Sequence, residues 1–179
     1  KVFSTENVFR IPSRHGVTFD IPGLEIVVLK PEDSRIPEKY PLPEIVKDYR
    51  ERLFGEQQNT SLLYQRITDW RPSKNSKTRV DQRQRVLASL RENQNSRAAI
   101  ISVWNPVEDV ESDHPISPVS ACFRIFGDEL HLILVARSID VWTGLVPELL
   151  AFSQLLTDTA VDLGLRQTKL RYYAFSAHV

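Results

Sequence analysis

Apolar and polar residues follow two spacings along the chain, one typical of strands and one of helices. Six short apolar runs rich in β-branched and aromatic residues predict strands, at residues 17–21, 24–29, 98–104, 121–126, 130–136 and 170–174. Pro22-Gly23 predicts a turn between the first two runs, and Gly127-Asp128 predicts a hairpin between the fourth and fifth. The run at 98–104 is almost wholly apolar, which is typical of a strand buried on both faces.

Three segments carry apolar residues at helical spacing, and they span residues 43–54, 80–93 and 147–163. Pro43 suits the first position of a helix, while Gly55 and Gly164 predict helix ends. The polar segments 71–79 and 106–118 predict loops. The basic loop 71–79 is interpreted as a solvated linker.

Composition narrows the class of protein. A chain of 179 residues with no repeat predicts a single domain over 1–179. The 23 basic and 23 acidic residues cancel, which argues against binding to nucleic acid or to a membrane surface through bulk charge. No apolar run approaches the roughly 20 residues that span a bilayer. One cysteine cannot form an internal disulfide, so we expect a cytoplasmic protein.

Few residues suggest chemistry before any family is considered. The sequence has no glycine-rich phosphate loop and no metal-ligand spacing, so no metal is expected. Cys122 lies in a predicted strand, where inert packing is the simplest interpretation. Arg137, Ser138 and Asp140 follow a predicted strand directly, and ligands of α/β sheets often bind beyond such a strand end.

Three ordered segments resemble the thymidylate synthase family, which includes the pyrimidine hydroxymethylases. The segments contain Asp81-Gln82 with Asn95-Ser96-Arg97 and Ser102-Val103-Trp104-Asn105, then Phe123-Arg124-Ile125-Phe126 with Arg137-Ser138-Ile139-Asp140, Gly144 and Pro147, and lastly Ser176-Ala177-His178-Val179. Together they cover about residues 42–179. The resemblance implies an α/β fold in which one mixed sheet carries helices mainly on one face and dimerises through the other. We expect Ile100, Ile101, Leu132 and Leu134 on that dimer face.

The resemblance also implies a site for a pyrimidine nucleotide. Arg137 with Ser138 is expected to hold the phosphate, because a planar guanidinium matches phosphate oxygens. Arg97 matches one of two arginines that the family lends from the partner subunit, although a surface charge is an equal interpretation. The other implied nucleotide contacts are Asp140, His178, Tyr64 and Arg14.

Several matched positions depart from the family pattern. The family's catalytic cysteine adds to C6 of the pyrimidine, which activates C5 for attack on a one-carbon unit from a folate. The matching pair in this chain is Pro118-Val119. Cys122 follows three residues later, and an odd offset along a strand points to the opposite face unless a bulge intervenes. The catalytic glutamate is matched by Asp48.

Three further departures concern binding groups. Ala98 replaces the second lent arginine, and Leu149 matches the asparagine that distinguishes uracil from cytosine. The family's C-terminal tail, which closes over the folate, is expected to be missing. These departures predict a nucleotide-binding protein in which C5 one-carbon transfer is lost or altered.

Two alternatives remain open. The chain is an active C5 methyl- or hydroxymethyltransferase that uses Cys122 and methylenetetrahydrofolate, or it is a non-catalytic structural or regulatory dimer module. In the second case Arg137 and Asp140 are expected to form a buried ion pair. No other cofactor is expected.

Overall fold

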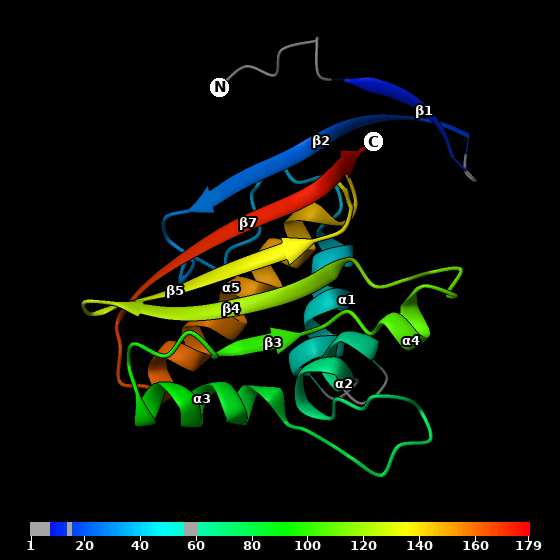
Figure 1. Cartoon of the computed structure of the whole chain (residues 1–179). Coiled ribbons are helices and arrows are strands. Elements are labelled where there is room, and N and C mark those ends of the chain that lie inside the picture. Colours follow the sequence, from blue (N-terminus) through cyan, green and yellow to red (C-terminus); the bar gives the residue numbers. More distant parts are fainter. Residues whose placement is uncertain (1–7, 14–15, 56–60) are drawn as a thin grey trace.

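The computed structural model describes residues 8–13, 16–55 and 61–179 (Figure 1). Its strands are β1 (Phe9–Ser13), β2 (Gly16–Val28), β3 (Ile100–Ser102), β4 (Pro118–Phe126), β5 (Glu129–Ala136), β6 (Ile139–Asp140) and β7 (Gln167–His178). Its helices are α1 (Pro43–Phe54), α2 (Leu62–Thr68), α3 (Gln82–Glu92), α4 (Pro106–Asp109) and α5 (Leu145–Asp162). Within the described residues, the strands and helices form the predicted mixed α/β architecture.

The described strands form one mixed sheet in the order β1-β2-β7-β5-β4-β3, and the short β6 pairs with the end of β7. Strand β7 is central because it pairs antiparallel with β2 and parallel with β5. The parallel pair is connected through α5, which provides the crossover that such strands need. Strand β6 lies parallel to the last residues of β7, so it brings Asp140 opposite His178.

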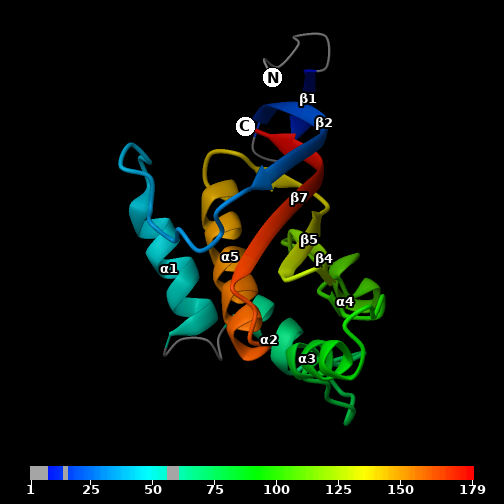
Figure 2. The ribbon, with the colours of Figure 1, turned by 90° about the vertical axis from the view of Figure 1, so that its left-hand side faces the viewer.

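Helix α5 packs on one face of the sheet, and α1 packs on α5 (Figure 2). Alternate residues of β4, β5 and β7 face these helices, and Phe123, Leu132 and Tyr172 are fully buried among them. In Figure 1, none of the described helices crosses in front of β4, β5 and β7 on the other face. The helices therefore lie mainly on one face, as predicted.

Three of the four residues predicted for the dimer face, Ile101, Leu132 and Leu134, lie on the other face of the sheet. Ile101, Leu132 and Leu134 are fully buried on the helix side of the sheet, whereas Ile100 is 45% exposed. Ile100 and Ile101 are neighbours in one strand and must point to opposite faces. The outward row that contains Ile100 continues through Cys122, Ile133, Arg171 and Val27, which are directly paired across the strands.

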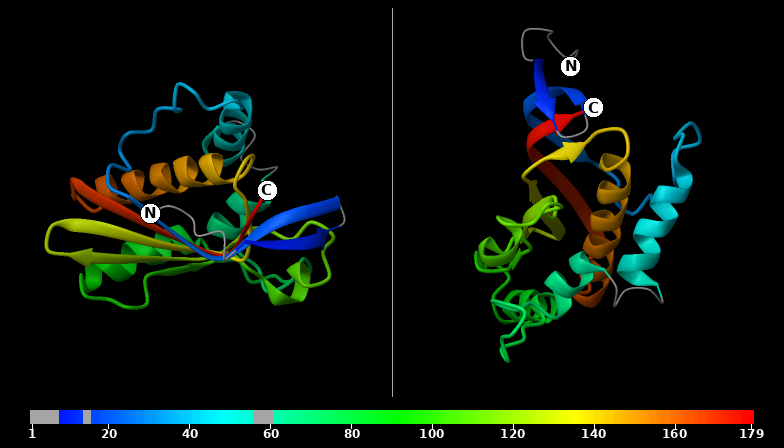
Figure 3. Two further views of the ribbon diagram at one scale, coloured as in Figure 1. Left: turned by 90° about the horizontal axis from the view of Figure 1, so that it is seen from above. Right: turned by 90° about the vertical axis from the view of Figure 1, so that its right-hand side faces the viewer.

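The first two predicted strands are one continuous strand. β2 runs through Pro22 and Gly23 without turning, and it pairs with β7 from Asp20 opposite His178 to Val28 opposite Leu170. Gly23 keeps the positive φ of 74° that the turn prediction relied on, but a long partner strand holds the backbone extended around it. Together, β1 and the start of β2 project from the sheet as a hairpin (Figure 3).

Two helices were not predicted. Helix α2 has only seven residues and begins at the N-cap Ser61, whose hydroxyl accepts from the Tyr64 amide. Helix α4 lies in the segment predicted as a loop, and Asn105 caps it by accepting from the Val107 amide. Such short helices lack the repeated apolar spacing by which longer ones are recognised.

Candidate active-site cleft

A cleft of about 630 Å³ opens where α1, the start of β4, β6 and the end of β7 meet. It is lined by five of the residues predicted for the site: Asp48, Arg137, Ser138, Asp140 and His178. They come from segments that are distant in sequence, and the sheet topology gathers them. This cleft is therefore the candidate functional site within the described part of the chain.

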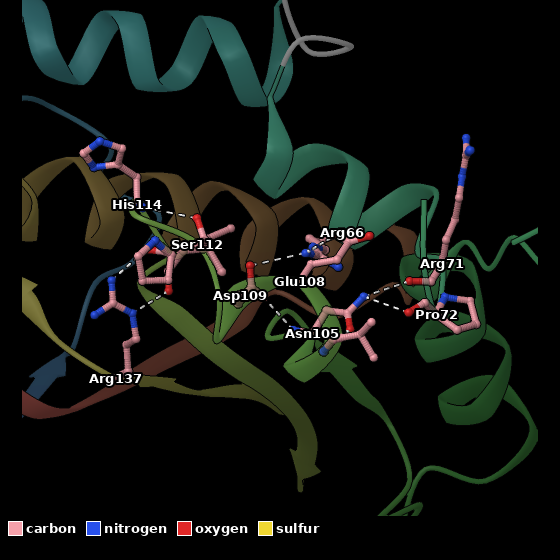
Figure 4. Close-up of polar contacts among 12 residues, drawn as sticks. Arg66, Arg71, Pro72, Asn105, Glu108, Asp109, Ser112, His114 and Arg137 are labelled. Atoms are coloured by element: carbon pink, nitrogen blue, oxygen red, sulfur yellow. Dashed lines mark hydrogen bonds and ion pairs between the residues drawn. The ribbon is translucent and has the colours of Figure 1, made fainter. Parts of the chain in front are cut away.

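Arg137 anchors the segment that leads into β4 (Figure 4). Its Nη2 donates to the Pro115 carbonyl at 2.6 Å, and its Nε donates to the Ile116 carbonyl at 3.0 Å. Its Nη1 donates to the Ser138 hydroxyl at 3.0 Å, and the guanidinium carbon lies 6.0 Å from the ring centre of Trp104. These contacts with two backbone carbonyls and one hydroxyl hold the guanidinium group at the cleft.

Asp140 is held by the backbone that follows it. Its Oδ1 accepts from the amides of Trp142 at 2.8 Å and Thr143 at 2.9 Å. Burial opposes its ionisation, but hydrogen bonds from Thr143 and Trp142 outweigh burial and lower its pKa. An ionised Asp140 therefore lies opposite His178 at the cleft. The hydrogen bonds of both Arg137 and Asp140 are largely with backbone groups.

Asp48 lies on the α1 side of the cleft. Its carboxylate pairs with Arg52 one turn later at 3.0 Å, and the Asp48 side chain is 54% exposed. An exposed pair at this spacing contributes little to stability. The predicted acid position is therefore accessible from the cleft but already engaged with a neighbouring cation.

Glu148 is a cleft residue that the sequence interpretation missed. It lies in the first turn of α5, lines the cleft, and is only 2% exposed. Its Oε1 accepts from the Tyr172 hydroxyl at 2.9 Å, and the Ser117 hydroxyl lies 3.5 Å from the same oxygen. Burial raises the pKa of Glu148 to about 7, although Tyr172, Ser117 and the charge of Arg137 oppose the rise.

Ser117 is the second missed residue. It immediately precedes β4, lines the cleft, and donates to the Ser138 carbonyl at 2.7 Å. Val119, which was matched to the family's cysteine, is not among the described residues that line the cleft. Pro118 pairs with Ala136 and Ser120 with Val135, so Val119 is the additional residue of a β-bulge. The carbonyl of Val119 accepts from the amides of Val103 and Trp104.

Cys122 lies on the opposite face of the sheet. It follows the bulge and alternates with Ala121 and Phe123, which are fully buried against the helices. It pairs with Ile100 and Ile133 in the outward row, and burial raises the pKa of its thiol. The bulge therefore does not bring Cys122 to the cleft.

Two other predicted residues that the structure describes, Tyr64 and Arg97, are not gathered in the cleft. Tyr64 lines a separate cavity of about 600 Å³ between the helices, with Phe152 and Asp158. Arg97 is exposed in the turn before β3 and is not among the described residues that line the cleft. Arg14 lies outside the described residues. Leu149 packs against the core, and its neighbour Glu148 faces the cleft instead.

A buried ion pair joins α2 to α4 (Figure 4). Arg66 of α2 is 4% exposed and contacts Asp109 at 3.3 Å and Glu108 at 2.9 Å, both on α4. The side-chain amide of Asn105 donates to the carbonyls of Arg71 and Pro72. Helix α4 is thereby fixed to α2 and to the basic loop.

Neither a metal centre nor a membrane helix is found in the part of the chain that the structure describes. No group of three or more His, Cys, Asp or Glu residues there could hold a metal ion. None of the helices there has the length and apolar character needed to cross a bilayer.

Comparison with known proteins agrees with this arrangement. The model of the thymidylate synthase family matches residues 46–179. A putative thymidylate synthase of Methanopyrus kandleri is 31% identical over 83% of this chain and 70% of its own length. One of Methanocaldococcus jannaschii is 27% identical over 90% of this chain and 75% of its own. The match to the thymidylate synthase of Haloferax volcanii, at 33% identity, covers 59% of this chain but 31% of that protein.

The fold and the cleft therefore define a domain of the thymidylate synthase type. The chain belongs to the thymidylate synthase family.

Proposed function

We propose that the chain binds a pyrimidine nucleotide, dUMP- or dCMP-like, in the cleft through its phosphate. Arg137 with Ser138 is the phosphate contact, and Asp140 and His178 contact the nucleoside. The observation that carries the proposal is that these four residues, chosen from sequence, line one cleft. A cationic planar side chain beside a hydroxyl is well suited to a phosphate dianion.

We further propose that standard one-carbon transfer to C5 is lost or altered. Activation of a pyrimidine at C5 needs a nucleophile that adds to C6, and thiolates serve far better than hydroxyls at neutral pH. Ser117 presents a hydroxyl to the cleft, and the single cysteine lies on the other face of the sheet. The cleft residues therefore do not fit the use of methylenetetrahydrofolate, the one-carbon donor of the family.

The active-enzyme alternative requires Cys122 to reach the cleft. That movement requires the outward row of the sheet to turn inward while Ala121 and Phe123, both fully buried, turn outward. The exposure of two core side chains would cost several kcal/mol, so the alternative has little support.

We propose a homodimer in the cytoplasm, formed through the outward sheet face. That face carries apolar side chains, including Ile100, Ile133 and Phe175, beside Arg171 and Tyr173. Exposed apolar residues gathered on one face are typical of an interface. In such a dimer the exposed Arg97 can be lent to the other copy, whereas Ala98 cannot contribute a charge.

Calorimetric titration with dUMP and dCMP tests nucleotide binding. Wild type should bind at least one of them saturably, and Arg137→Gln should weaken binding about tenfold or more through the loss of a charge-assisted contact. Ser138→Ala is the second variant, because Arg137 also anchors Pro115 and Ile116 and its loss can loosen that segment. Arg83→Gln, on α3 away from the cleft, is the matched control and should bind as wild type does. Absence of binding to both nucleotides would contradict the proposal.

A further inference from the structure

The cleft contains a buried carboxyl group, that of Glu148, that is available to the base of the proposed nucleotide. Glu148 lines the cleft while its side chain is almost wholly buried. Within the described part of the chain, its side chain accepts from the hydroxyl groups of Tyr172 at 2.9 Å and Ser117 at 3.5 Å, and both hydrogen bonds involve Oε1. A buried carboxyl held by hydroxyls on one oxygen can use the other oxygen for a ligand.

The place of Glu148 relative to the phosphate contact supports this role. Ser117 contacts Glu148 through its hydroxyl and also donates to the carbonyl of Ser138, whose own hydroxyl meets Arg137. A single residue, Ser117, thus connects the carboxyl group of Glu148 to the proposed phosphate contact. A nucleotide whose phosphate meets Arg137 can place its base near Glu148 in a cleft of about 630 Å³.

We propose that Glu148 contacts the hydrogen-bonding edge of the base and selects an amino-bearing, cytosine-type pyrimidine over a uracil-type one. This inference rests on the proposed function and names its substrate class. An ionised carboxylate only accepts hydrogen bonds, and the 4-amino group of cytosine donates one. Uracil presents a carbonyl oxygen at that position, so an acceptor would face an acceptor in a buried site, which penalises binding.

Protonation of Glu148 should weaken this selectivity. When Oε1 accepts from Tyr172, a neutral carboxyl group carries its proton on the other oxygen, so it offers the base a donor instead of an acceptor. The groups that face Glu148 are Tyr49 of α1, Ser117 before β4, Arg137 after β5 and Tyr172 of β7. Arg137 and Tyr172 favour the ionised form, and burial opposes it. The preference for cytosine should therefore increase as pH rises through about 7.

Calorimetry with dCMP and dUMP at pH 6 and pH 8 tests the inference. The ratio of the two dissociation constants is the informative quantity, because both ligands carry the same phosphate and its protonation cancels. Wild type should prefer dCMP by about tenfold or more at pH 8 and by less at pH 6. Glu148→Gln keeps an oxygen acceptor for Tyr172 and offers an amide donor to the base in place of the carboxylate acceptor, so the dCMP preference should be lost or reversed at both pH values.

Tyr172→Phe provides a second readout that retains the carboxyl. It removes a hydrogen bond that favours the ionised form, so the pH at which selectivity appears should move upward. Equal binding of dCMP and dUMP by wild type at pH 8, or an unchanged preference in Glu148→Gln, overturns the inference. If both nucleotides bind equally and binding still depends on Arg137, only the base assignment fails. If neither binds, the proposed function fails with it.

Discussion

The Tyr172 hydroxyl donates a 2.9 Å hydrogen bond to Oε1 of Glu148, and this bond joins the central strand β7 to the first turn of α5. Tyr172 is fully buried and Glu148 is 2% exposed. A charged carboxyl group in this position destabilises the fold. The cost is avoided when the group holds a proton or contacts a ligand. Both outcomes can be measured on this buried pair.

The stability of the protein should fall as pH rises from about 4.5 to about 7. The pKa of Glu148 is near 7 when folded and near its ordinary 4.5 when unfolded, so the folded state binds more protons in that window. The contribution is fully present below pH 4.5 and is lost above pH 7. Relative to wild type, Glu148→Gln should gain about 3 kcal/mol of unfolding free energy between those limits. Urea denaturation at several pH values measures this.

An exposed glutamate provides the control for that experiment. Glu44 of α1 is 79% exposed and pairs with Lys47, so Glu44→Gln removes a carboxyl group without touching the cleft. A flat difference between wild type and Glu148→Gln across the window would contradict the assignment of a raised pKa.

Ser117→Cys should place a thiol in the cleft. In a Cys122→Ser background the new thiol is the only one in the chain, so its reactivity can be followed alone. We expect alkylation that dCMP or dUMP slows, because Ser117 lines the cleft that the nucleotide enters. We also expect slow exchange of the pyrimidine C5 hydrogen in heavy water, which thiol addition at C6 permits. Alkylation that neither nucleotide slows would place residue 117 outside the binding site.

Cys122→Ser should leave nucleotide affinity within about twofold of wild type, because the thiol lies on the outward face of the sheet. Titration calorimetry of the two proteins measures this. Loss of turnover with retained nucleotide binding in the variant would instead support Cys122 as a nucleophile.

Ile133→Glu should separate the proposed dimer. Ile133 lies in the outward row between Cys122 and Arg171, and the burial of a carboxylate there beneath a second copy costs more than its pairing with Arg171 returns. Analytical ultracentrifugation should show a dimer for wild type and a monomer for this variant. Val107→Glu, at a 65% exposed position on α4, is the matched control and should remain a dimer. A monomeric wild type would contradict the proposal.

Asp109→Asn should destabilise the fold by about 3 kcal/mol, because it leaves the buried charge of Arg66 with a weaker partner. Glu108→Gln removes the other, more exposed carboxylate of the same arginine and should cost about 1 kcal/mol or less. Chemical denaturation of both variants measures the difference. Equal effects would mean that burial does not distinguish the two pairs.

Local signals predicted the parts of the fold that local physics determines. The β4–β5 hairpin follows from two apolar runs around Gly127, whose φ is +66°, and the end of α5 follows from Gly164 at +73°. The turn signal at Pro22-Gly23 failed because β2 gains more from pairing along β7 than from turning. Only long-range pairing decides that case, and a single sequence does not contain it.

The cleft was predicted in part for a similar reason. Arg137, Ser138, Asp140 and His178 follow motifs that keep their spacing along the chain, and the structure brings these four residues to one cleft. The matches to Val119 and Leu149 depended on counting residues from a proline. A bulge at Val119 and the helical turn at Glu148 put other side chains in the cleft, and neither can be seen from spacing alone.

A crystal structure of the protein grown with dCMP tests the central claim most directly. We expect the phosphate within hydrogen-bonding distance of Arg137 and Ser138. We expect the 4-amino group of the base to donate to the carboxyl group of Glu148. An empty cleft at saturating nucleotide, or a nucleotide bound elsewhere, would contradict the claim.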